Sequence, residues 1–142
     1  MTSIHKVYEA FLSKMLEDEW LHWTEEEIEA DWRQLLNGAI PHFKFPRVDL
    51  NIDDSGNFYG DLGVEEIQIL ASFMKCEWLS REILTWENIK PLYVERDFSQ
   101  ANLIDKLQKL LDKERSEARY LERLYYRSRS RQPFDYTKLA GE

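Results

Sequence analysis

Apolar side chains recur at steps of three and four residues along most of the chain, the spacing that places them on one face of an α-helix. The pattern predicts four helices, over about residues 3–16, 24–38, 63–89 and 97–130. In the second helix, Thr24 and Glu27 have the spacing of a capping box, and Asn37-Gly38 is a typical helix end. The third is apolar over most of its circumference, which indicates burial on several sides. We therefore expect a helical bundle with the third helix at its centre.

One segment instead alternates apolar and polar residues, as a β-strand does. The apolar residues of this segment are Val48, Leu50 and Ile52. A DDSG turn follows them, and residues 57–62 return as a second strand. We therefore expect a small β-hairpin over about residues 47–62. The same segment resembles a calcium-binding loop that begins at Asn51, but Leu62 stands where such a loop needs a bidentate glutamate. The missing ligand favours the hairpin turn.

The last predicted helix is longer than a domain of this size requires. At 1.5 Å per residue it extends over roughly 45–50 Å, and its apolar density falls after Asp112. A helix longer than its domain projects from it, and the last residues, QPFDYTKLAGE, are typical of an extended tail. The expected fold is a compact, mainly α-helical bundle with one small β-hairpin, a long projecting C-terminal helix and an extended tail. We assign residues 1–118 to the helical domain and residues 119–142 to a docking arm.

Composition and motifs limit the classes of function. No apolar run reaches the roughly 18 residues of a membrane span, so no membrane association is expected. The one cysteine, Cys76, excludes an internal disulfide framework and fits a reducing interior. His22 and Glu26 have a four-residue spacing that can share a metal on a helix, but no third ligand accompanies them. Phosphate-binding glycine loops and catalytic motifs are absent. The sequence predicts no enzyme, no cofactor and no metal.

The charge of the chain is uneven. Its formal net charge is -8, with three basic and nine acidic side chains in residues 1–40 but ten and seven in residues 98–142. The basic end contains YYRSRSRQPFDY, in which arginines alternate with serine and aromatics flank them. Arginine binds phosphate or carboxylate, and tyrosine stacks on bases or packs at protein interfaces. The expected partner-binding residues are Arg119, Arg123, Tyr126, Arg127, Arg129, Arg131, Phe134 and Tyr136.

Two kinds of partner fit this basic segment. Basic side chains at a helix end are also favoured by the negative end of the helix dipole alone. A solvated tail, however, gives no reason for Phe134 and Tyr136 to follow a proline, whereas a peptide that docks into a groove needs such side chains. Because a DNA-binding module usually has a basic face and this chain is acidic overall, protein is the favoured partner and DNA the alternative.

Two stretches carry a family resemblance: GVEEIQILASFMKCEWLSREI, then DFSQANLIDKLQKLLDKERSEARYLERLYYRSR. Their order is similar to that in the small head–tail connector (neck or adaptor) proteins of tailed bacteriophages. In that family an EEI..LA..M...WL...I helix precedes a DF...L..L helix that ends in tyrosines and arginines. The match covers about residues 61–131 and rests on Glu66, Ala71, Met74, Trp78, Asp97, Phe98 and Leu107.

The resemblance implies a structural protein of the virion neck, synthesised in the cytoplasm of a bacterial host. Such subunits form a ring beneath the portal, reach the portal with a C-terminal helix or tail, and continue the DNA channel toward the tail. The implied partners are further copies of the chain, the portal protein and a tail or second neck protein. DNA would pass nearby without sequence-specific binding, and an acidic lumen that does not grip it would suit a conduit.

Two other functions fit the same residues. One is a different virion component, such as a tail completion or baseplate protein. The other is a small helical regulator that binds DNA through residues 119–131. Oligomeric state separates the virion components from the regulator.

Overall fold

The computed structural model describes residues 1–15, 20–88 and 97–131, with the backbone alone at 97–101 and 129–131. The fold is mainly helical with a small two-stranded antiparallel sheet, as the sequence predicts in outline. The elements in chain order are β1 (Thr2–Ser3), α1 (Ile4–Ser13), α2 (Glu25–Ala39), the 3-10 turn η1 (Ile40–His42), β2 (Asn57–Phe58), α3 (Val64–Asn88) and α4 (Asp97–Arg131).

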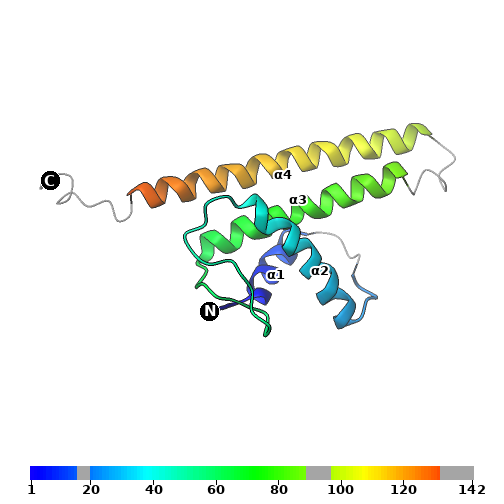
Figure 1. The fold of residues 1–142 in the computed structure, drawn as a ribbon. Helices are drawn as coiled ribbons and strands as arrows, with labels where there is room; N and C mark the ends of the chain where they lie inside the picture. Colours follow the sequence, from blue (N-terminus) through cyan, green and yellow to red (C-terminus); the bar gives the residue numbers. More distant parts are fainter. Residues whose placement is uncertain (16–19, 89–96, 132–142) are drawn as a thin grey trace, which may run out of the picture.

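Helix α3 is the centre of the fold. It lies between α4 on one side and the pair α1 and α2 on the other (Figure 1). Apolar residues surround it, and Leu70, Phe73 and Met74 have at most 2% of their surface exposed. Because it buries surface toward two layers, α3 lacks the single apolar stripe of a surface helix. The prediction of a central helix is confirmed.

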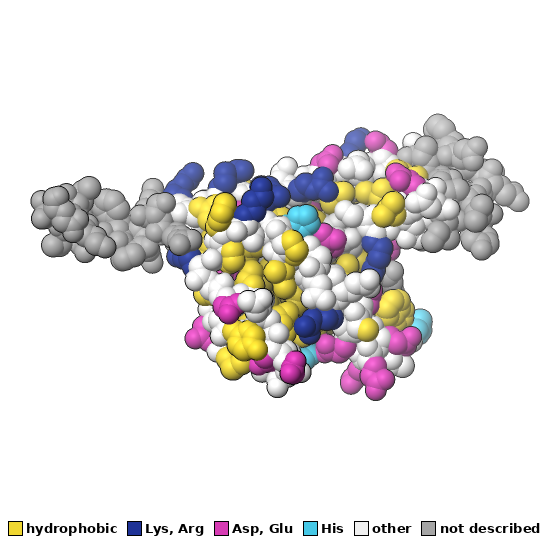
Figure 2. All heavy atoms as spheres, in the orientation of Figure 1, with side chains coloured by type: hydrophobic (Ala, Val, Ile, Leu, Met, Phe, Trp, Pro, Cys, Tyr) yellow, Lys and Arg dark blue, Asp and Glu magenta, His cyan; other side chains and the backbone are white. Residues whose placement is uncertain are grey.

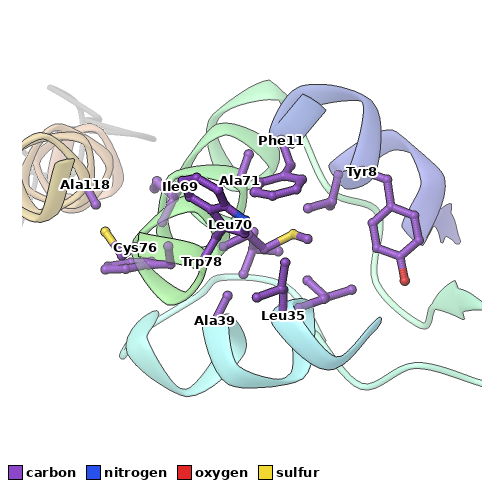
Figure 3. Close-up of a cluster of buried hydrophobic side chains, with 14 of the residues drawn as sticks. Tyr8, Phe11, Leu35, Ala39, Ile69, Leu70, Ala71, Cys76, Trp78 and Ala118 are labelled. Carbon is purple, nitrogen blue, oxygen red and sulfur yellow. The ribbon is translucent and has the colours of Figure 1, made fainter. Parts of the chain in front are cut away.

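An aromatic cluster fills the space between α3 and the layer of α1 and α2. Trp32 packs edge-to-face against Tyr8, Phe11 and Trp20, with ring centroids 5.5 to 6.1 Å apart. Trp78 of α3 adjoins Trp20 and is 6% exposed, close to Phe11 and Leu70 in Figure 3. Edge-to-face aromatic pairs are worth about 0.5–1.5 kcal/mol each beyond the area they bury. These rings therefore fix how α1 and α2 sit on α3.

Helix α4 packs along α3 through one continuous seam. The residues that form it alternate at steps of three and four and are all buried or half-buried: Ile104, Leu107, Leu111, Glu114, Ala118, Leu121 and Tyr125. Ala118 is completely buried and faces α3 near Cys76 (Figure 3). Lys75 of α3 pairs with the buried Glu114 at 3.5 Å between Nζ and Oε2. The seam holds α3 and α4 together as an antiparallel helical hairpin.

The small sheet differs from the expected hairpin. Strand β2 pairs with β1 at the N-terminus, with Thr2 opposite Phe58 and Ser3 opposite Asn57. The β1 segment is too short to show a two-residue period, because α1 begins immediately after it. The turn itself is confirmed, since backbone hydrogen bonds join residues 49, 51 and 53 to residues 60, 59 and 57.

Side chains hold this turn closed. Asp53 accepts hydrogen bonds at 2.9 Å from the backbone N–H groups of Ser55 and Asn57. Gly56 has φ of 82°, a left-handed conformation that glycine adopts without a steric penalty. The carboxylate that looked like a calcium ligand in the sequence therefore acts as an acceptor for the backbone of the turn.

The start of the expected docking arm is part of the folded domain. Helix α4 runs without a break through residue 118, and Tyr125 beyond it is 1% exposed. Residues 119–128 therefore lie against the domain and do not project from it. The residues after Arg131 lie outside the described part of the chain. None of the described helices is both long and apolar enough to cross a membrane.

Candidate interaction surface on helix α4

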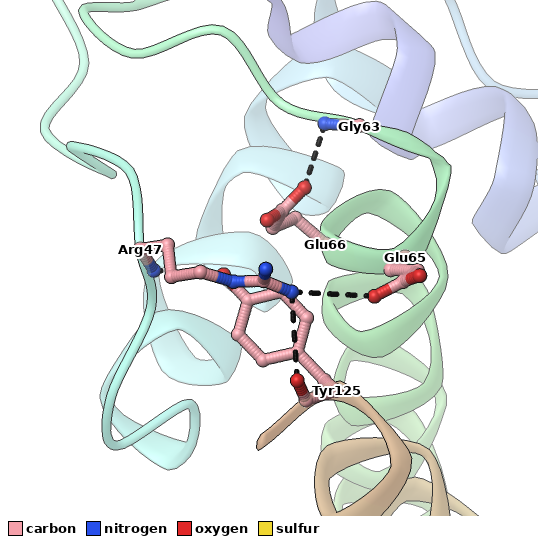
Figure 4. A network of polar contacts seen from close by, with 5 residues as sticks. All are labelled: Arg47, Gly63, Glu65, Glu66 and Tyr125. Carbon is pink, nitrogen blue, oxygen red and sulfur yellow. Dashed lines mark hydrogen bonds and ion pairs between the residues drawn. The ribbon is translucent and has the colours of Figure 1, made fainter. Parts of the chain in front are cut away.

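Tyr125 anchors the last turns of α4 to the segment that follows η1. Its ring packs edge-to-face on Phe43, and its hydroxyl accepts a hydrogen bond at 2.7 Å from the backbone N–H of Arg47. The Arg47 guanidinium lies over the ring, 4.0 Å from its centroid, and reaches Glu65 of α3 (Figure 4). Burial, followed by a hydrogen bond with Glu66, raises the pKa of Tyr125 above its ordinary value.

A second group of polar contacts lies beside this anchor. The Tyr126 hydroxyl donates to Glu122 at 2.7 Å and accepts from the backbone N–H of Phe45 at 3.2 Å. Arg119 donates to the same carboxylate at 2.6 Å and to the carbonyl of His42 at 3.3 Å. Burial and then the contact with Glu122 raise the pKa of Tyr126. Arg119 and Tyr126, both expected to bind a partner, are thus engaged within the subunit.

The opposite side of α4 faces solvent and forms the candidate interaction surface. We call it the α4 face and define it by Tyr120, Arg123, Leu124 and Arg127. Tyr120 is 52% exposed and Leu124 39%. The Arg123 guanidinium lies 5.8 Å from the centroid of the Tyr120 ring. The face combines two cations with an apolar surface, a composition suited to a carboxylate-bearing partner.

The two arginines belong to a longer row. Arg115, Arg119, Arg123 and Arg127 follow at four-residue intervals, about 6 Å apart along the axis. In Figure 2 basic side chains line the half of α4 nearest its C-terminal end, while acidic ones lie on the other half of α4 and along the opposite edge of the molecule. A hollow of about 510 Å³ lies between Asp112, Arg115, Ser116, Arg119 and Arg123. The row gives α4 a positive surface on an acidic protein.

Cys76 is a free, buried cysteine that lies beside this row. It contributes to a cavity of about 320 Å³ between α3 and α4, together with His42, Glu77 and Arg119. Burial, and then the nearby Glu114 carboxylate, raise the pKa of the thiol to about 12. A thiol that stays protonated at neutral pH is a poor nucleophile. Its interpretation as a small buried hydrophobe therefore fits its surroundings.

The remaining predicted residues lie where side chains are not described. Arg129 and Arg131 are in α4, but only their backbone is described, and Phe134 and Tyr136 lie outside the described residues. Sequence reasoning missed Arg115, Tyr120 and Leu124 on the same helix. The signal for all three was in the spacing, because Arg115 continues the row by four residues and Tyr120 and Leu124 also stand four apart.

Within residues 1–15, 20–88 and 97–131, no group of three or more His, Cys, Asp or Glu side chains is arranged to hold a metal ion. No family model matches this chain, and no curated protein or solved structure is significantly similar to it.

Proposed function

We propose that the chain is a structural head–tail connector subunit of a tailed bacteriophage. In this role it assembles with further copies into a ring that joins the portal to the tail in the virion neck and continues the DNA channel. The observation that carries the proposal is the α4 face: a cationic surface with two exposed apolar side chains, held on a helix whose end is fixed to the domain.

The arrangement of α3 and α4 supports a structural role. The stretch that resembles connector proteins, residues 61–131, corresponds to these two helices. A seam of closely packed side chains joins them, and Tyr125 and Tyr126 fasten the end of α4 to the segment around Phe45 and Arg47. A partner that binds α4 would thus contact a rigid surface, which lowers the entropic cost of association.

The fixed end of α4 also determines where the rest of the chain leaves the domain. Phe134 and Tyr136 follow Arg131 by only three and five residues. We propose that they enter a groove of the portal or of an adjacent ring subunit and supply most of the affinity there. Aromatic side chains commonly dominate binding energy at interfaces.

Co-assembly with the portal protein from the same genome tests this function. The full chain should form rings in negative-stain images and co-sediment with the portal. Removal of residues 132–142, or Phe134→Ala with Tyr136→Ala, should leave a helical protein that no longer joins the portal. A matched double substitution on exposed positions of α4, Lys106→Ala with Lys109→Ala, should not affect binding. Unchanged portal binding after the truncation would contradict the docking-tail proposal.

A DNA-binding regulator is the second candidate, and the arginine row favours it. The exposed guanidinium groups of this row, those of Arg115, Arg123 and Arg127, can contact phosphates of a nucleic acid backbone. Such binding would weaken steeply as salt is raised. Duplex DNA binding that requires Arg115 and Arg123, in a protein that stays monomeric, would favour this candidate over the connector.

A further inference from the structure

A second exposed surface of the molecule mixes charge with apolar side chains. The turn before α2 presents Leu21, 69% exposed, and Trp23, 38% exposed. Glu25 and Glu26 follow them in the first turn of α2 and are exposed as well. We call these four residues the α2 turn. Like the α4 face, the α2 turn combines two large apolar side chains with two charged ones. Its charges are negative, whereas those of the α4 face are positive.

The α2 turn is held in place by its neighbours. Trp20 is buried, its indole N–H donates to Asp31 at 2.8 Å, and its carbonyl accepts from the backbone N–H of Trp23. Thr24 and Glu27 close the capping box that the sequence predicts. Leu21 and Trp23 are therefore presented to solvent on a turn whose neighbours are fixed, and they are available to a partner.

The acidic side chains of the α2 turn also lack ion-pair partners within the described part of the subunit. Nearby acidic side chains have partners within the subunit: Glu29 pairs with His5, and Asp31 pairs with Arg81. In the described part of the chain Glu25 and Glu26 form no ion pair, and the same holds for Arg123 and Arg127 on the α4 face. Both surfaces therefore contain charged side chains that, within the described residues, are not engaged in an ion pair of their own subunit.

We infer that the α4 face of one copy docks on the α2 turn of a second copy, an inference that rests on the proposed ring-forming function. The start of α2 and the last turns of α4 lie at opposite ends of the molecule, so the two surfaces cannot meet within one chain (Figure 1). Contacts between two α4 faces or two α2 turns would place like charges together. The favoured contact is head-to-tail, which closes into a ring when the rotation between copies allows it.

The pairing uses the chemistry of each side chain. Arg123 and Arg127 can form charge-assisted hydrogen bonds with Glu25 and Glu26, and a guanidinium can also stack on the indole of Trp23. Tyr120 and Leu124 would cover Leu21 at the centre of the contact. Interfaces of this kind depend on apolar anchors for affinity and on charge for partner choice and register.

Charge exchange tests the contact. Two reversal variants of the full chain are required, Arg123→Glu with Arg127→Glu, and Glu25→Arg with Glu26→Arg. Mass photometry and sedimentation would measure their self-association across a concentration series. Each double reversal should weaken self-association by at least about tenfold. The variant that carries all four substitutions should associate within about threefold of the unmodified chain, because opposite charges face each other again. Lys106→Glu with Lys109→Glu serves as a control for the arginine reversal, with the same change in net charge, and should have no effect.

Recovery of self-association in the four-substitution variant distinguishes loss of the contact from misfolding. A loss of association through misfolding would not be restored by two further reversals, and circular dichroism of each variant would reveal it directly. Failure of the four-substitution variant to recover would overturn the inference, as would reversals that leave self-association intact but abolish binding to duplex DNA. A chain that is monomeric alone yet binds the portal would overturn this contact and leave the connector function standing. Charge-dependent self-association as predicted, but without binding to the portal, would support this contact and contradict the connector function.

Discussion

Two buried tyrosines provide a matched pair for testing the packing of α4. Tyr8 is 2% exposed and Tyr125 is 1% exposed, so the same change, tyrosine to phenylalanine, removes one buried hydroxyl at either position. Their hydroxyls differ in surroundings. That of Tyr125 accepts from the backbone N–H of Arg47 at 2.7 Å, whereas that of Tyr8 has no partner in the described structure.

The expected free-energy changes follow from these partners. In Tyr125→Phe the backbone N–H of Arg47 loses its hydrogen bond, and leaving such a group unsatisfied costs about 1–3 kcal/mol. Tyr8→Phe removes a polar group that is buried without compensation and should stabilise the fold by about 0–1 kcal/mol. The two variants should differ by about 1–4 kcal/mol.

Urea unfolding followed by tryptophan fluorescence measures both variants at pH 7. The midpoints should move in opposite directions while the slope with urea stays unchanged, which would identify the effect as one on stability. Equal losses in the two variants, or a loss below about 0.5 kcal/mol for Tyr125→Phe, would refute the assignment of Tyr125 as the anchor of α4.

Three further expectations concern the core. Trp78→Ala should lower the free energy of unfolding by about 3–5 kcal/mol because it empties the space beside Trp20; a loss below about 1 kcal/mol in chemical denaturation would contradict the central position of α3. Cys76 should react with a thiol reagent only as fast as the protein opens, since burial raises its pKa to about 12; rapid labelling of the folded protein, followed by absorbance, would oppose this. Burial, then the Glu29 carboxylate, raises the pKa of Tyr8 to about 12. The stabilisation tied to this shift is complete below the ordinary tyrosine pKa of about 10 and is lost as pH rises from about 10 to 12. When the free energy of unfolding is measured by urea denaturation between about pH 9 and pH 12, Tyr8→Phe should lose less stability than the unmodified chain. An identical loss in both proteins would contradict the contribution of Tyr8.

The regular part of the fold could be predicted from local pattern. The expected helix over residues 24–38 is α2, Glu25–Ala39, and the expected helix over 63–89 is α3, Val64–Asn88. Both were accessible because caps and apolar spacing depend on residues a few positions apart. The pairing of β1 with β2 was not accessible, since it joins residues more than fifty positions apart and β1 has only two residues.

Of the candidate site, the sequence predicted the exposed arginines of α4 but not the contacts that its other residues make within the subunit. Four-residue spacing indicated the arginine face, and Arg123 and Arg127 do lie on the exposed side of α4. The inward roles of Arg119 and Tyr126 depend on the segment around Phe45, about eighty residues earlier in the chain. An aromatic or arginine near a helix end suits a partner's groove and a pocket of its own domain equally well. Only the tertiary position of that segment decides between them.

The most direct test of the connector proposal is single-particle imaging of the full chain, alone and mixed with the portal protein of the same genome. The proposal predicts closed rings of the chain that stack coaxially on the portal, with a central channel and with residues beyond Arg131 contacting the portal. A protein that remains monomeric in both samples, and instead retains duplex DNA through the arginine row of α4, would contradict it.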